Sequence, residues 1–163
     1  MNAEIDFYVD TEYQNIDSFD CGYAVFNDYL IRHIPKDKAV FHYIINPEDD
    51  SLIAYFSLLA SCILIGEFDR HNFISAIELK MFAVDKKYQK RNLSNRLVDA
   101  IINIVSEYSS EYVGAELLIL YSVPTEQVVH MYEKSGFEKL PSEWFMYKSY
   151  FSEGCVPMYK IIE

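Results

Sequence analysis

The sequence predicts one domain of mixed α/β fold, and three observations support that prediction. The length of 163 residues suits a single domain spanning 1–163 with one functional site. Hydrophobic residues make up 51% of the chain and charged residues 24%, a balance typical of a globular protein with a packed core. Apolar residues alternate in some segments and recur at three- and four-residue spacing in others. Strands and helices that follow one another in this way favour an α/β architecture.

The first half of the chain predicts a short strand, a helix and a hairpin. Residues 22–33 place apolar side chains such as Phe26 and Leu30 at helical spacing, and Pro35 then limits extension of that helix. The polar run 46–50 contains a proline and three acidic residues, which is typical of an exposed turn. The predicted elements, in order, are a strand at Ile5–Val9, a helix at 22–33 and hairpin strands at Val40–Ile45 and Leu52–Ile65.

The second half continues as strand, helix, strand and helix, followed by two further strands. Residues 75–84 alternate apolar and polar side chains, which indicates a strand with at least one buried face. Residues 93–108 carry the clearest helical stripe in the sequence, and Gly136 ends the helix after it. The strands are expected at Ser75–Val84, Ala115–Val123, Trp144–Phe151 and Val156–Ile162, and the helices at Leu93–Tyr108 and Thr125–Ser135.

Charge and composition exclude several classes of protein. The chain carries 14 basic and 25 acidic residues, a net charge of −11, which opposes non-specific attraction to nucleic-acid backbones and anionic membranes. No apolar run approaches the roughly 18 residues of a membrane span, and the N-terminus lacks the pattern of a signal peptide. Cys21, Cys62 and Cys155 lie far apart without a metal-binding or disulfide pattern. We therefore expect a cytoplasmic protein with reduced cysteines, no metal site and no membrane association.

The connection between the strand ending at Val84 and the helix beginning near Leu93 concentrates positive charge. Residues 86–96 hold five basic side chains and no acidic one, so the remaining nine basic and 25 acidic residues give the rest of the chain a charge of −16. A turn that opens a helix also offers free backbone N–H groups and the positive end of the helix dipole. Such a turn suits an anion, and a diphosphate is its natural ligand. The alternative is a solvated basic turn, since such runs are common.

Two motifs in this region resemble those of the GNAT acetyltransferase superfamily. The segment Gln89–Ser94 is similar to the Q-x-x-G-x-G/A loop that binds acetyl-CoA, and Val128–Phe137 resembles the A-x-x-x-Y-E-K-x-G-F signature further along. Their order and spacing are more specific than either motif alone. The resemblance implies the GNAT fold, a mixed central sheet of about six or seven strands flanked by helices. It also implies an N-acetyltransferase that uses acetyl-CoA as its cosubstrate.

Four shorter segments resemble a narrower branch of this superfamily, the GNAT toxins that acetylate aminoacyl-tRNA. They are Phe19–Gly22, Phe26–Leu30, Ala54–Leu58 and Val156–Tyr159. This resemblance implies an aminoacyl-tRNA acceptor. The charge argues against that acceptor, because a tRNA-binding protein should carry basic groups beside the acceptor cleft. Outside the loop, the best available basic residues are Arg32, Lys36 and Lys38.

The resemblance also implies which residues bind acetyl-CoA. In the superfamily, the strand before the loop binds the pantetheine arm through its backbone, and peptide N–H groups of the loop bind the pyrophosphate. The expected acetyl-CoA-binding residues are Phe82, Ala83, Val84, Gln89, Lys90, Arg91, Asn92, Leu93, Ser94, Asn95 and Thr125. Two loop glycines of the family are Asn92 and Ser94 here, and an asparagine frequent in the family is Thr125.

Two residues are expected to take part in the reaction. Tyr132 corresponds to the tyrosine of the second motif, so the resemblance implies that it gives a proton to the departing CoA sulfur. Glu78, on the strand before the loop, is a candidate general base. Tyr132 is one of 14 tyrosines, so a ring that only packs on its helix is the alternative. Glu78 is one of 25 acidic residues, so a solvated or salt-bridged side chain is the alternative there.

The acceptor and the assembly stay open at the level of sequence. The short motifs indicate an aminoacyl-tRNA acceptor. The acidic surface instead favours a cationic acceptor, such as a small-molecule amine or a lysine-rich peptide. A chain whose loop glycines are replaced is alternatively a non-catalytic interaction module. Members of the superfamily are often dimers, so a homodimer is a further expectation.

Overall fold

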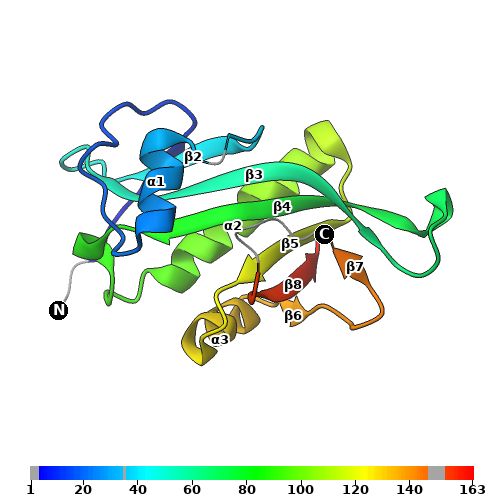
Figure 1. The fold of residues 1–163 in the computed structure, drawn as a ribbon. Helices are drawn as coiled ribbons and strands as arrows, with labels where there is room; N and C mark the ends of the chain where they lie inside the picture. Colours follow the sequence, from blue (N-terminus) through cyan, green and yellow to red (C-terminus); the bar gives the residue numbers. More distant parts are fainter. Residues whose placement is uncertain (1–3, 35, 147–152) are drawn as a thin grey trace. The chain divides into compact units, whose positions relative to one another are not determined.

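A computed structural model describes residues 4–34, 36–146 and 153–163, and Figure 1 shows its fold. The helices are α1 (Ala24–Arg32), α2 (Ser94–Tyr108) and α3 (Glu126–Lys134). The strands are β1 (Tyr8–Asp10), β2 (Val40–Ile45), β3 (Leu52–Leu64), β4 (Phe73–Val84), β5 (Leu117–Ser122), β6 (Glu138–Lys139), β7 (Phe145–Met146) and β8 (Val156–Ile161). Two 3₁₀ turns, η1 (Arg70–Asn72) and η2 (Lys86–Tyr88), and a π-helical turn, η3 (Ser109–Val113), complete the described elements.

The strands form one mixed sheet in the order β1-β2-β3-β4-β5-β8-β6, and β7 pairs with β3 outside that path. β4 and β5 run parallel, whereas the neighbours β1–β2, β2–β3, β5–β8 and β6–β8 run antiparallel. The parallel pair needs a crossover connection, and α2 lies in the chain between its two strands. The mixed α/β prediction is therefore confirmed. The described residues form eight strands, more than the six or seven expected.

Contacts within the chain define two compact units, and β3 and β4 each run through both. The first unit comprises Met1–Leu59 and Lys80–Ser94, and the second comprises Ala60–Leu79 and Asn95–Glu163. The connection after β4 belongs to the first unit, and the helix that carries Tyr132 belongs to the second. A single domain spanning 1–163 stays a prediction.

The core of the first unit is formed by α1 and the strands β2, β3 and β4. The buried Tyr55 hydroxyl donates a hydrogen bond to the Phe26 carbonyl at 2.7 Å, which ties α1 to β3. The buried Tyr29 hydroxyl donates to the Asp37 carboxylate at 2.9 Å. Both tyrosines thus bring their polar ends to partners, as burial requires. The clustered core residues are Phe19, Cys21, Tyr29, Leu30, Tyr43, Ile45, Leu52, Tyr55, Met81 and Ala83.

The core of the second unit lies along the parallel pair of strands. β4 and β5 pair in register from Ala76 opposite Leu117 to Leu79 opposite Leu120. Ala76 and Leu117 belong to a cluster completed by Ile63, Ile119 and Met146. The helix α2 buries four residues at helical spacing, so its predicted apolar stripe is confirmed. These four residues are Leu97, Val98, Ile101 and Val105.

The predicted element bounds hold in the middle of the chain and change near its ends. The hairpin strands were expected at Val40–Ile45 and Leu52–Ile65, and the second ends one residue earlier, at Leu64. β1 begins at Tyr8 instead of Ile5, because its extent is set by pairing with β2. The predicted strand Trp144–Phe151 is represented by β7, and residues 147–152 lie outside the described residues. No helix in the described part of the chain is long and apolar enough to cross a bilayer.

Candidate active site

The connection between β4 and α2, residues 85–93, forms a tight turn that is braced from within; we call it the β4–α2 loop. Its first residue, Asp85, is buried, and the carboxylate accepts a hydrogen bond from the Lys87 N–H at 2.9 Å. The Asp85 carbonyl accepts two more, from the N–H groups of Tyr88 at 2.9 Å and Gln89 at 3.2 Å. These bonds shape the turn η2, so the chain leaves β4 in a fixed direction.

Two residues of the β4–α2 loop adopt the left-handed backbone conformation without being glycine. The φ angles are 59° at Lys90 and 55° at Asn92. Asparagine tolerates this region better than most residues because its short polar side chain can bond locally, whereas lysine has no such advantage. Asn92 stands where the family has a glycine, so the loop reaches a glycine-like conformation at the cost of some backbone strain.

The β4–α2 loop leaves donors available at the start of α2. The peptide N–H groups of residues 90–93 make no hydrogen bond within the described chain. The first turn of α2 adds N–H groups that no helix satisfies internally, together with the positive end of the dipole of a 15-residue helix. An anion of the size of a phosphoryl group can be bound by such a set of donors.

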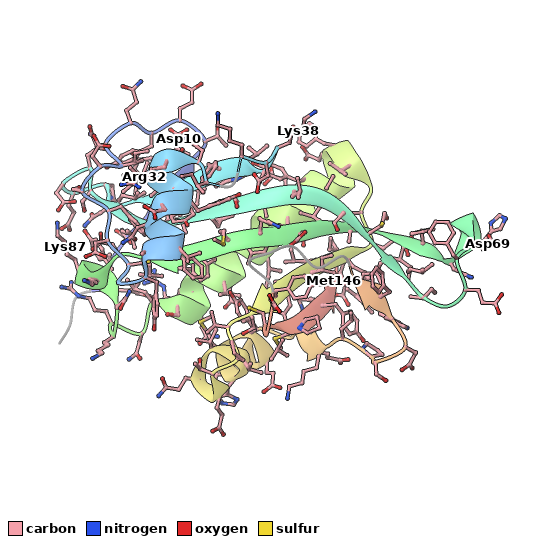
Figure 2. All side chains as sticks on the ribbon, viewed as in Figure 1. Asp10, Arg32, Lys38, Asp69, Lys87 and Met146 are labelled. Atoms are coloured by element: carbon pink, nitrogen blue, oxygen red, sulfur yellow. The ribbon has the colours of Figure 1, made fainter. Side chains whose placement is uncertain are left out.

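The same loop carries exposed cations. Lys86, Lys87, Lys90 and Arg91 are all exposed, and Figure 2 labels Lys87 at this turn. The Arg91 guanidinium lies over the ring of buried Tyr88, 5.6 Å from its centroid, which orients the cation. The Tyr88 hydroxyl in turn contacts Ser51 and receives a hydrogen bond from the Asn46 amide at 3.3 Å, both in the β2–β3 turn. Four of the five predicted basic residues are therefore exposed on the β4–α2 loop, whereas Arg96 lies half-buried on α2.

Residues Phe82, Ala83 and Val84 form the end of β4, beyond its pairing with β5. The β4–β5 ladder ends at Leu79, although β4 continues for five residues to Val84, so β5 offers no partner to this end of the strand. The Val84 carbonyl is already engaged, because the Gln89 side-chain amide donates to it at 2.8 Å. Gln89 therefore braces the β4–α2 loop with its side chain, a role that the motif alone did not reveal.

The side chains of Asn95 and Thr125 have different surroundings. The Asn95 amide donates to the Met131 carbonyl at 3.0 Å and to the Ser135 hydroxyl at 3.2 Å, which fastens the first turn of α2 to α3. This side chain is thus committed to the fold. Thr125 precedes α3 as its exposed N-cap residue, and its side chain makes no capping hydrogen bond.

Tyr132 lies on α3, one residue after the carbonyl that Asn95 binds. Its side chain is only 7% exposed, and its ring meets Phe137 edge to face at 5.6 Å. The hydroxyl makes no hydrogen bond within the described chain, and no fully enclosed side-chain nitrogen or oxygen there lacks a partner. The hydroxyl therefore keeps some contact with solvent. Burial raises the pKa of Tyr132 above its ordinary value, so the proton is held at neutral pH.

Glu78 lies on β4 opposite Ile119 of β5 and is 9% exposed. Two residues beyond Ile119, the Tyr121 hydroxyl donates a hydrogen bond to the Met146 carbonyl at 3.0 Å. Burial, and then the negative charge of Glu78, raise the pKa of Tyr121 to about 12. Glu78 is thus a buried acidic residue whose charge acts on Tyr121. No local pattern indicates a role for Tyr121, because its relation to Glu78 depends on the β4–β5 register.

The family of the protein follows from comparison of its sequence with family models. A model described as the acetyltransferase (GNAT) domain matches residues 26–149, which includes the β4–α2 loop and Tyr132. The chain belongs to the GNAT acetyltransferase family. The resemblance seen in the two motifs is therefore confirmed, and with it the GNAT fold. None of the curated proteins matches this GNAT chain significantly.

Solved structures of toxins share the fold of this GNAT chain. A crystal structure described only as a bacterial toxin has a TM-score of 0.73 at 19% identity, covering 98% of this chain and 92% of that one. AtaT complexed with acetyl-methionyl-tRNAfMet has a TM-score of 0.68 at 19% identity, covering 91% and 98%. AtaTR bound with AcCoA has a TM-score of 0.68 at 20% identity, covering 96% and 94%. At these identities the likeness establishes the fold alone.

Proposed function

We propose that this GNAT protein is an acetyl-CoA-dependent N-acetyltransferase that acts on a primary amine. The observation that carries the proposal is the β4–α2 loop, where the peptide N–H groups of residues 90–93 are available directly before the N-terminus of α2. Exposed cations of the same loop add positive charge where a pyrophosphate would bind. The structure of AtaTR with AcCoA supports acetyl-CoA as the ligand.

The β4–α2 loop fits a pyrophosphate although it lacks the family glycines. Recognition through backbone N–H groups depends on the conformation of the loop, and Asn92 already has the positive φ that glycine would supply. The side chains of Asn92 and Ser94 are exposed and make no hydrogen bond in the described chain. No structural bond therefore has to break for a ligand to reach the loop.

Two side chains are proposed to move protons during acetyl transfer. Bound acetyl-CoA supplies the activated thioester, and the reaction then needs a neutral amine and a proton donor for the departing thiolate. Tyr132 is the proposed donor, because burial keeps its hydroxyl protonated and no partner in the described chain engages it. Glu78 is proposed to accept, directly or through water, the proton that the amine loses as its C–N bond forms.

Titration with acetyl-CoA in a calorimeter tests the proposal. We expect saturable heat and a higher melting temperature, because a ligand that binds only the folded state stabilises it. Replacing both Lys87 and Lys90 with glutamine should weaken binding about tenfold, since two charges beside the helix terminus are lost. The matched control replaces the exposed Lys134 and Lys139, which lie outside the loop. Absence of both heat and thermal shift at millimolar acetyl-CoA would instead favour a non-catalytic interaction module.

The proposed acceptor is the amino group of an aminoacyl-tRNA. The solved complex of AtaT with acetyl-methionyl-tRNAfMet favours this class of acceptor. Lys36 and Lys38 are exposed in the segment after α1, and Arg32 ends that helix. Figure 2 labels Arg32 beside α1 and Lys38 near the start of β2, apart from each other in this view. The carboxylate between the two lysines, Asp37, accepts hydrogen bonds from the buried Tyr29 hydroxyl. These cations provide positive groups that can contact phosphates.

Release of the CoA thiol, measured with different acceptors, tests this choice. We expect turnover with aminoacyl-tRNA, at a rate that falls as salt is added, because phosphate contacts release bound counterions. Replacing Lys36 and Lys38 with glutamine should slow the reaction with tRNA and leave acetyl-CoA binding unchanged. Turnover with a polyamine, an aminoglycoside or a lysine-rich peptide, and none with tRNA, would assign the protein to acetylation of cationic amines.

A further inference from the structure

The segment before α1, Phe19–Gly22, runs beside the β4–α2 loop and bonds to it directly; we call it the 19–22 segment. Figure 1 shows this blue segment next to the green turn that follows β4. Four hydrogen bonds join the two. The Lys86 N–H donates to the Asp20 carbonyl at 2.9 Å, and the Asp20 N–H donates to the Asp85 carboxylate at 3.0 Å. The Lys86 ammonium donates to the Asp20 carboxylate at 2.8 Å. The Gln89 side-chain amide donates to the Cys21 carbonyl at 2.8 Å.

The 19–22 segment is itself firmly held. The side chains of Phe19 and Cys21 are buried in the core of the first unit, and the Phe19 ring meets that of Tyr55 at 5.4 Å. Gly22 has a φ of 95°, and a Cβ atom there would lie 3.2 Å from the Lys86 side chain. A larger residue would thus meet both backbone strain and the side chain of the loop. The segment can therefore act as a rigid support.

The Asp20 carboxylate joins this support to the loop. One oxygen accepts hydrogen bonds from the Gly22 N–H at 2.8 Å and the Asn27 amide of α1 at 2.9 Å, and the other accepts the Lys86 ammonium. The Lys86 hydrogen bond, with those from Asn27 and Gly22, lowers the pKa of Asp20 to about 2. The carboxylate is therefore ionised at every physiological pH and keeps its three partners.

We propose that Asp20 is a positioning residue for acetyl-CoA, acting through the β4–α2 loop. The loop holds Lys90 and Asn92 at positive φ without glycine, and backbone strain of this kind persists only where neighbouring contacts enforce it. The 19–22 segment supplies those contacts on the N-terminal side of the strained residues. A preorganised loop binds its anion without an ordering penalty. The inference rests on the proposed function and names what keeps the binding loop in shape.

The variant Asp20→Ala tests this role by two readouts. We expect the dissociation constant and KM for acetyl-CoA to rise about tenfold, because the unbound loop loses its preorganised conformation. The kcat at saturating acetyl-CoA should stay within about twofold, because bound acetyl-CoA then holds the loop in place. Hydrogen exchange at the amides of residues 86–89 should become faster. Asp28→Ala is the matched control: it removes an equal charge from α1, where Asp28 pairs with Arg32 at 3.6 Å, and should change neither readout.

The outcomes separate this inference from the proposed function. If wild-type protein binds acetyl-CoA and Asp20→Ala binds it equally well, the positioning role is overturned while the function stands. If wild-type protein binds no acetyl-CoA, the proposed function fails and the role of Asp20 for acetyl-CoA falls with it; loop exchange in Asp20→Ala then tests only whether Asp20 keeps the loop in shape, and unchanged exchange overturns that as well. Should Asp20→Ala fail to fold, Asn27→Ala takes its place, because it removes the bonds of Asn27 to Asp20 and to the Cys21 N–H. The same two results are then expected.

Discussion

Replacing Tyr132 with phenylalanine should lower kcat for acetyl transfer about 100-fold, which is the lower end of what a positioned proton donor contributes. Phenylalanine keeps the ring and its edge-to-face contact with Phe137, so the fold should tolerate the change. The lost hydroxyl has no partner in the described chain, so no buried group is left unsatisfied. The loss corresponds to about 2.7 kcal/mol of transition-state stabilisation.

Thiol release at saturating acetyl-CoA measures this rate, and calorimetry measures whether cofactor affinity is kept. Tyr112→Phe serves as the control, because Tyr112 lies exposed on the turn η3 and the change removes the same atom. The control should match wild type in both measurements. Full kcat in Tyr132→Phe would remove this hydroxyl from the mechanism without affecting the acetyl-CoA proposal.

The β4–α2 loop shows how a fold can reproduce a glycine-dependent conformation with other residues. Lys90 and Asn92 have positive φ angles. Hydrogen bonds on the N-terminal side of the loop hold the backbone in this strained conformation. Gln89 is central to these bonds, since its amide spans the carbonyls of Cys21 and Val84. The loop thus keeps the backbone conformation that glycine would allow, although its residues are not glycine.

Most of the fold could be predicted because its central elements have strong local patterns. The stripe of residues 93–108 is buried as its spacing indicates. On β4 the predicted apolar face is buried at Ile77, Leu79, Met81 and Ala83, but the opposite face is also buried at Ala76 and Glu78. β6 was missed because its two residues, Glu138 and Lys139, have no pattern of their own and become a strand only by pairing with β8. The turn η3 was also missed. It follows α2 directly and extends that helix by five residues beyond the predicted end at Tyr108.

The parts of the candidate site that consist of neighbouring residues in the sequence could be predicted. The hydrogen bonds that join residues far apart in the sequence could not. The basic cluster and the helix start were visible in residues 86–96. The bonds from Asp20 to the loop join residues 65 and 66 positions apart, so no local pattern indicates them. The role of the Asn95 side chain likewise depends on Met131, which lies 36 residues away.

Replacing Glu78 with glutamine should slow acetyl transfer by about 100-fold, because the isosteric amide cannot take the proton that the acceptor amine loses. Glutamine fills the same space on β4, so the β4–β5 pairing around Ile119 should persist. Acetyl-CoA affinity should not change, since the proposed binding groups belong to the loop and not to Glu78. The measurement is kcat for thiol release with saturating acetyl-CoA, together with the calorimetric dissociation constant.

A base and a purely structural carboxylate at Glu78 predict different results in this experiment. A structural role would lower the melting temperature and leave kcat of the folded enzyme unchanged, whereas a base would lower kcat at unchanged affinity. Glu116→Gln is the matched control, because Glu116 is exposed just before β5 and loses the same charge. Since Glu78 also raises the pKa of Tyr121, Tyr121→Phe separates the two effects. If Tyr121→Phe alone reproduced the loss of kcat, the proton transfer would belong to Tyr121 and Glu78 would act only through it.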